Sequence, residues 1–227
     1  MKKWISLFDL CPIRPGMCND RAARITAMSY LRDCPDREQR MEKQLLNTSE
    51  YILLRGKDSF NGLLQMVETD PVSRITGQAI TDLYNSVPKA YRKNAVFLMN
   101  VVTLNELSRS LGLERDLISC RDDGTFMLME KPIVLCNAMP FIQEGSVPIL
   151  FGDFSKVSIE DCGRDELRQE PYDGNPGAMQ CTLTGYMDCM LEERLAVRGC
   201  FRYGLSLKCL SKLRLRKLMS SLCSSGL

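Results

Sequence analysis

The stretch VPILFGDFSK, residues Val147–Lys156, holds a single carboxylate between two phenylalanines. The apolar run VPILF predicts a buried strand, and the overlapping FSKVSIED predicts a second strand. A Gly-Asp pair between two such runs is a common turn signal, because glycine tolerates the positive φ that many turns require. We therefore interpret Gly152 and Asp153 as a structural turn. The alternatives are an acid tuned for catalysis and a metal ligand, but a lone carboxylate is weak evidence for either.

The composition restricts the chemistry that the chain can perform. Its 227 residues, 44% hydrophobic and 26% charged, suit a folded protein with one sizeable core or two small ones. The absence of histidine excludes Ser-His-Asp triads, Cys-His dyads and HExxH zinc sites. We expect no catalytic residue, no metal and no cofactor. No apolar run is long enough to predict a membrane helix, and the apolar part of the opening MKKWISLFDL is too short for a signal peptide.

The eleven cysteines are an odd number, so they cannot all pair within the chain. No two of them form a CxxC, the spacing typical of zinc ribbons and of dithiol redox proteins. Cys136, Cys181 and Cys200 stand among apolar residues, where a thiol behaves as a small buried hydrophobe. We expect reduced, mostly structural cysteines in a cytoplasm.

The first half of the chain predicts two helices. Residues 1–30 lack periodicity and are typical of an arm or loop. The next segment predicts a helix with Asp36 as its N-cap and Gly56 just past its end. The GKDSFNG that follows lacks the residue order of a phosphate-binding loop. Residues 75–87 are apolar at helical spacing until Pro88 stops the pattern.

The second half is dominated by predicted strands. AVFLMN at residues 95–100 predicts a buried strand, and TLNELSRSLG predicts a helix with Thr103 as N-cap, Glu106 as its capping-box partner and Gly112 at its end. A turn is expected at residues 122–125, and the later CTLTGYMDCMLEERLAVRGCF is typical of long strands. This order of elements favours an α+β fold with helices layered on a mainly antiparallel sheet.

Glu192 and Glu193 are adjacent, which does not suit a catalytic pair. On a strand they would face opposite sides, and on a helix they would lie about 100° apart. We expect one of them to pair with Arg194 or Arg198 and the other to lie in solvent. An enzyme that uses Asp153 with Glu192 is a competing hypothesis.

The C-terminal segment, residues 205–227, is basic and contains no acid. Such a cluster attracts nucleic-acid phosphates or an anionic membrane, although it is also compatible with a solvated chain end. A small nucleic-acid-binding module that acts through this tail is therefore an alternative. The candidate DNA contacts are Lys208, Lys212, Arg214, Arg216 and Lys217.

Several motifs occur in an order that resembles a known family. VPKAYRKNAVFLMNVVTLNELSRSLG, EKPIVLCNAMP, VPILFGDFSKVSIED and MLEERLAVRGCF together resemble the major capsid proteins of tailed bacteriophages, which have the Hong Kong 97-type fold. YILLRGKDSFNGLL is similar to the family's stretch after its extended loop. The likeness covers roughly residues 30–210 and depends on the order of the motifs.

The resemblance implies an α+β subunit with a peripheral domain, which holds a long spine helix, and an axial domain. On this interpretation residues 1–30 are a remnant of the N-terminal arm and extended loop, which are mostly missing here. Residues 31–93 and 159–210 form the peripheral domain, with the spine helix at 75–87. Residues 94–158 form the axial domain and residues 211–227 the basic tail.

The resemblance also implies a function. Copies of the chain would assemble as pentamers and hexamers into an icosahedral shell around double-stranded DNA, with scaffold and portal proteins as further partners and no membrane. The protein would reside in the virion capsid, and in the host cytoplasm before assembly. Some members form a Lys–Asn cross-link assisted by a glutamate. Glu192 is similar to that glutamate, but the asparagine has no match, so we expect no cross-linking. An encapsulin-like compartment that encloses protein is an alternative.

Overall fold

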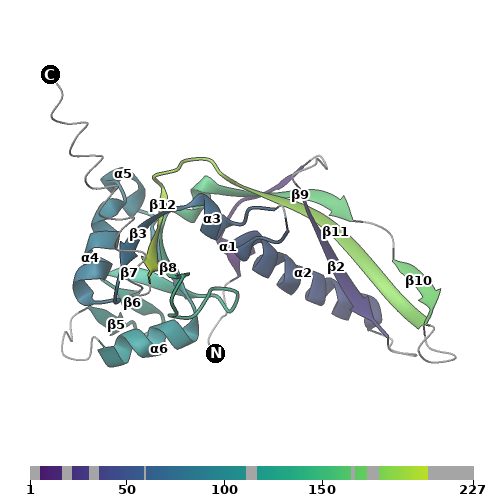
Figure 1. Ribbon diagram of the computed structural model, residues 1–227, viewed down its shortest axis with the longest axis horizontal. Helices are drawn as coiled ribbons and strands as arrows, with labels where there is room; N and C mark the ends of the chain where they lie inside the picture. The colour runs from purple at the N-terminus through teal and green to yellow at the C-terminus, as the bar shows by residue number, and fades with distance from the viewer. Residues whose placement is uncertain are drawn as a thin grey trace, which may run out of the picture.

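The computed structural model describes residues 6–16, 22–30, 36–58, 60–110, 117–164, 167–172 and 179–203. Its elements form two sheets and the helices that pack on them (Figure 1). In chain order they are α1 (Leu7–Leu10), β1 (Ile13–Pro15), β2 (Ala23–Ser29), α2 (Arg37–Arg55), α3 (Leu63–Met66), β3 (Glu68–Val72), α4 (Gly77–Ser86), α5 (Lys89–Arg92), β4 (Val96–Met99), α6 (Val101–Ser110), β5 (Ile118–Cys120), β6 (Phe126–Leu128), β7 (Lys131–Leu135), β8 (Ser146–Gly152), the 3₁₀ turn η1 (Phe154–Lys156), β9 (Val157–Arg164), β10 (Arg168–Pro171), β11 (Met179–Leu191) and β12 (Val197–Arg202).

The five-stranded sheet is built around the long strand β11. β9 and β10 pair with β11 in antiparallel fashion, β2 pairs with it as well, and β1 joins β9 in parallel. Alternate residues of β11, such as Leu183 and Met187, are buried, as a strand with one covered face requires. Helix α2 packs against β2 and β11 (Figure 1). Gly185 allows this approach, because a Cβ there would lie 3.1 Å from a methyl carbon of Leu45.

Helix α2 confirms the predicted boundaries. Asp36 is its N-cap and Gly56, with a φ of 77°, ends it. Glycine is also required at the next turn, since a Cβ on Gly62 would lie 2.3 Å from the backbone nitrogen of Gly56. The chain therefore folds back tightly after α2 and leads through α3 into the second sheet.

The seven-stranded sheet has the order β3-β12-β8-β4-β7-β6-β5. All seven residues of its interior strand β8 are buried, because both faces of the sheet are covered. Phe97 and Phe151 belong to a core shared with α4 and α6 on one face. Leu98 and Leu150 belong to a second core on the other face, which continues to α2 and the five-stranded sheet. The two sheets are thus joined by one continuous apolar cluster.

Other predicted elements are confirmed with small changes. The helix expected over 75–87 is α4, which begins after Thr76, whose hydroxyl accepts a hydrogen bond from the Ala79 N–H. The strand expected over 95–100 is β4. The turn at 122–125 is present, with Gly124 at a φ of 83°. The α+β class is correct, and both sheets are mainly antiparallel with some parallel pairs.

The predicted start of the third helix is wrong. α6 begins at Val101, and Thr103 lies buried inside it rather than at its cap. The side-chain oxygen of Asn100 accepts a hydrogen bond from the Val102 N–H at 3.0 Å, as an N-cap residue does. β4 ends at Met99 and α6 begins at Val101, so Asn100 alone separates strand and helix, and Glu106 is exposed. The expected helix end at Gly112 lies outside the described residues.

The sheets group the chain differently from the expected domain boundaries, which remain a prediction. β3, α4 and β12 lie with residues 94–152 around the seven-stranded sheet. The helix expected to be the spine, α4, has 10 residues and packs against β12. The helix that runs along the five-stranded sheet is α2, with 19 residues (Figure 1).

Candidate functional site

The FGDF segment crosses from one core to the other. Phe151 is fully buried beside Phe97, with ring centroids 4.3 Å apart, and stacks on Tyr84 at 5.2 Å. Phe154, three residues later, is 2% exposed and belongs to the other core. The two phenylalanines therefore anchor one corner of the chain in both apolar clusters.

Gly152 and Asp153 form the bend between these anchors. A Cβ on Gly152 would lie 2.1 Å from the carbonyl oxygen of Ala196 and 2.6 Å from Cα of Val197, so only glycine fits there. The Asp153 N–H donates to the same Ala196 carbonyl at 2.9 Å. Its carboxylate accepts hydrogen bonds from the N–H of Ser155 at 3.1 Å and from the Ser155 hydroxyl at 2.7 Å.

This arrangement fixes a turn rather than assembling a catalytic group. Asp153 is 5% exposed, and the hydrogen bonds to its carboxylate come from a residue of the same turn. Within the described ranges, no three cysteine or carboxylate side chains gather as a metal site. The corner holds β8, η1 and the chain before β12 in one geometry.

The expected partner of the adjacent glutamates is wrong. Glu192 forms an ion pair of 3.1 Å with Arg14 on β1, and Glu193 is exposed. The sequence did not predict this ion pair, because Arg14 and Glu192 are far apart in the chain. Only the parallel pairing of β1 with β9 brings β1 toward the end of β11. Arg198 lies on β12 in the other sheet and has partners of its own.

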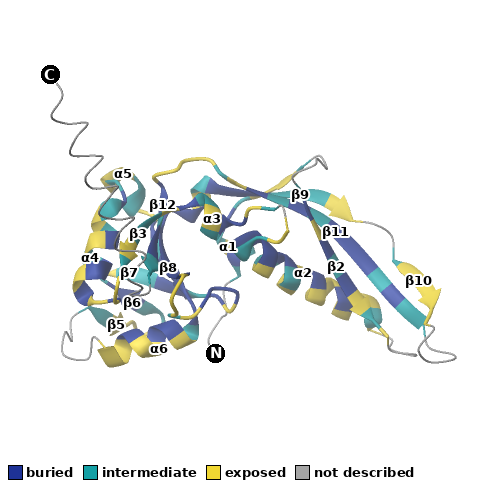
Figure 2. Ribbon diagram, viewed as in Figure 1, coloured by how far each residue is buried: buried dark blue, intermediate teal, exposed yellow. Residues whose placement is uncertain are grey.

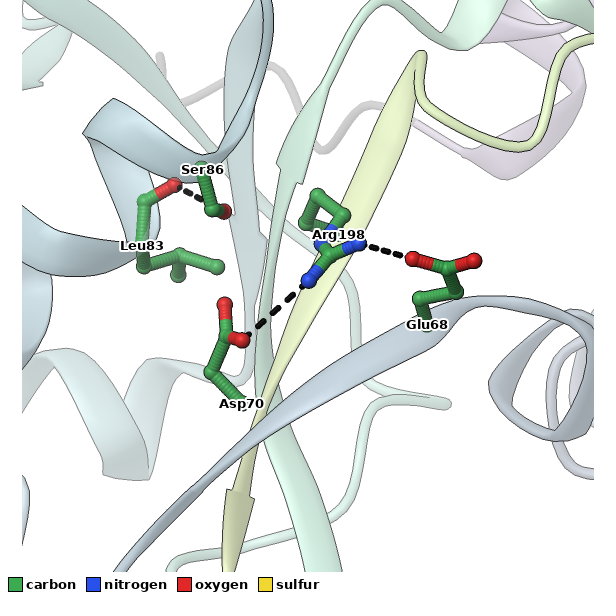
Figure 3. A network of polar contacts seen from close by, with 5 residues as sticks. All are labelled: Glu68, Asp70, Leu83, Ser86 and Arg198. Carbon is green, nitrogen blue, oxygen red and sulfur yellow. Dashed lines mark hydrogen bonds and ion pairs between the residues drawn. The ribbon is translucent and has the colours of Figure 1, made fainter. Parts of the chain in front are cut away.

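Those partners form a polar cluster that the sequence analysis missed. The Arg198 guanidinium lies between Glu68 and Asp70 of β3, donating to a carboxylate oxygen of each, at 3.1 Å for Asp70 (Figure 3). The parallel register places Arg198 beside Glu68 and Cys200 beside Asp70. Two acids at i and i+2 on one strand were the available signal, because such residues share a face.

The described cysteines are free thiols, and burial explains their chemistry. Burial raises the pKa of Cys136 to about 12, with the Glu50 charge adding to the effect. The pKa of Cys189 and of Cys200 is also raised to about 12, mainly by burial. These groups remain protonated at neutral pH, which suits a packing role.

Two apolar surfaces are open to a partner. A groove of about 440 Å³ runs between α2, β1 and β9, and both Ile13, 53% exposed, and Leu46, 39% exposed, line it. At the far end of the five-stranded sheet, Tyr30 and Tyr172 are exposed and their ring centroids lie 4.9 Å apart. Both surfaces belong to the elements and loops around the five-stranded sheet.

The five candidate DNA contacts of the basic tail, at positions 208–217, lie outside the described residues, so their role remains a prediction. Within the described ranges, every helix falls short of the length or the apolar character that crossing a bilayer demands.

Comparisons with known proteins agree with this architecture. The model of the Phage capsid family matches residues 38–192, more than half of the chain. No curated protein sequence matches this chain. Among solved structures, the capsid of an empty GTA particle aligns with a TM-score of 0.63 at 16% identity, covering 90% of this chain and 92% of that one. The holo-SrpI encapsulin complex from Synechococcus elongatus PCC 7942 aligns with a TM-score of 0.62 at 13% identity, covering 88% of each chain.

The fold and the family match define a structural shell protein with the Hong Kong 97-like α+β fold. The chain belongs to the phage capsid family.

Proposed function

We propose that copies of this chain assemble as pentamers and hexamers into an icosahedral shell that encloses double-stranded DNA in a virion, and that the chain performs no catalysis. The observation that carries the proposal is the extent of the family match. Residues 38–192 begin in α2 and end just after β11, so they include strands of both sheets. Scaffold and portal proteins are further proposed partners, and the host cytoplasm is the proposed location before assembly.

Within this shell, α2 rather than residues 75–87 takes the role of the spine helix. Its 19 residues run along β2 and β11, whereas α4 packs against β12 of the compact sheet (Figure 1). The elements around the five-stranded sheet then form the peripheral domain and those around the seven-stranded sheet the axial domain. On this assignment β3 and β12 belong to the axial domain, whereas the boundaries expected from the sequence placed both strands in the peripheral domain.

Shell assembly explains the apolar side chains that a single subunit leaves exposed. Ile13 and Leu46 line an open groove, and Tyr30 and Tyr172 lie at the far end of the sheet. Neighbouring copies that cover these side chains gain roughly 25 cal/mol for each Å² of apolar surface removed from water. Symmetry repeats each such contact many times, so modest interfaces suffice.

Purified particles test the enclosed cargo. The full chain is expressed, particles are isolated by sedimentation and treated with nuclease, and the protected contents are analysed. Double-stranded DNA inside the particles is expected. Particles that hold a defined protein and no nucleic acid would instead support an encapsulin-like compartment, the alternative that the structural likeness to the SrpI complex suggests. A chain that forms no particles with or without co-expressed scaffold would refute both.

A further inference from the structure

Helix α2 places most of its charges on two sides. At about 100° per residue, Glu38 and Glu42 fall on one side of the helix and Arg40 and Lys43 on the other, whereas Glu50 lies only about 20° from Lys43. Two of these three acids are already occupied: Glu42 pairs with Arg164 of β9, and Glu50 accepts hydrogen bonds from residues 6 and 7.

The other side forms what we call the α2 basic stripe. It comprises Arg40, Lys43, Gln44, Asn47 and Tyr51, which fall within a sector roughly 100° wide. All five are exposed, and Figure 2 shows exposed residues along the side of α2 that faces away from the sheet. All five line a shallow depression of about 440 Å³ along the helix, and Arg40 and Gln44 also line one of about 390 Å³ toward β2.

The cations of the stripe are available for a partner. No carboxylate among the described residues forms an ion pair with Arg40 or Lys43. The Tyr51 hydroxyl accepts a hydrogen bond from Arg55 at 3.4 Å, which leaves its own proton free to donate. The amides of Gln44 and Asn47 add further donors.

We propose that the α2 basic stripe binds the phosphate backbone of the enclosed DNA, so that this side of the subunit faces the interior of the shell. The inference rests on the proposed function and names the surface of the subunit that contacts the enclosed DNA. Arginine, lysine, amide and tyrosine side chains are the groups that contact phosphates without reading sequence. The apolar groove of Ile13 and Leu46, which Lys43 and Asn47 also line, borders the stripe and is left to neighbouring copies of the chain. From residue 40 to residue 51 the stripe is about 16 Å long, which matches about five phosphates of one strand.

The test measures binding of a fluorescent duplex DNA of random sequence to the full-length subunit between 50 and 200 mM salt. Each lost phosphate contact lowers the slope of log K against log salt by about 0.9. Arg40→Gln/Lys43→Gln is therefore expected to reduce the slope by about 1.8. Its loss of affinity across this salt range becomes about tenfold smaller than that of the wild type. Lys43→Gln alone is expected to reduce the slope by about 0.9.

Lys89→Gln/Lys93→Gln is the matched control, because it removes two exposed charges beside the other sheet. Its slope is expected to equal that of the wild type. The basic tail is present in every variant, so its contribution cancels. The proposal is overturned if Arg40→Gln/Lys43→Gln keeps the wild-type slope, if the control changes as much, or if the wild type does not bind DNA. Failure of the proposed function appears separately, as a wild-type chain that forms no particles.

Discussion

Gly152→Ala tests whether the FGDF corner joins the two cores. The added methyl group would lie 2.1 Å from the Ala196 carbonyl oxygen and 2.6 Å from Cα of Val197, both backbone atoms that no side-chain rotation can move. The start of β12 must shift, and overpacking of this kind costs about 1–3 kcal/mol. The hydrogen bond from the Asp153 N–H to Ala196 is lost as well, at about 1 kcal/mol. The expected destabilisation is about 3 kcal/mol.

Urea unfolding of the unassembled subunit, followed by circular dichroism, measures this loss. With an m-value of about 3 kcal/mol/M, the midpoint falls by about 1 M. Gly124→Ala is the matched control, because its φ is 83° but no atom lies within 4 Å of the added methyl group. This control measures only the cost of placing an alanine at a positive φ, which is about 1 kcal/mol and lowers the urea midpoint by about 0.3 M. Equal midpoints for the two variants would refute the close approach at the corner.

Three further outcomes are expected. Asp153→Ala removes two accepted hydrogen bonds from a buried turn, and should lower the free energy of unfolding by about 1–3 kcal/mol without altering any activity; an unchanged urea midpoint would contradict its role in the turn. Arg198→Met should destabilise by about 1 kcal/mol because it removes the shared partner of Glu68 and Asp70, whose side chains are 50% and 39% exposed, whereas Glu68→Gln should cost less because the pair of Arg198 with Asp70 remains; the reverse order in urea unfolding would argue against the cluster. Iodoacetamide at pH 8, mapped by mass spectrometry, should label exposed Cys120 and spare Cys136, whose pKa is raised to about 12 by burial; equal labelling would show that Cys136 is accessible.

Local signals in the sequence predicted the elements that local chemistry determines. Asp36 and Gly56 bound α2 at the expected positions; Gly56 ends the helix with a positive φ, whereas the Asp36 side chain makes no capping hydrogen bond. The continuous apolar run before Gly152 predicted a buried strand because both faces of β8 are covered. The order of motifs predicted the family, which no single motif would have done.

Contacts between distant strands could not be predicted in this way. Glu192 pairs with Arg14 across β9, and Arg198 reaches Glu68 through a parallel register. Both pairings depend on sheet order, which the alternation of side chains does not encode. The cap of α6 was misassigned because Thr103 and Glu106 match a capping box, whereas the preceding Asn100 already fills that role.

The central claim is that the chain is a shell subunit, and electron microscopy of the purified full-length protein tests it most directly. Negative-stain images, combined with light scattering, are expected to show closed particles of uniform diameter built from many 25.8 kDa subunits. A single species with the mass of one subunit, at every concentration and salt and also with co-expressed scaffold, would contradict the account.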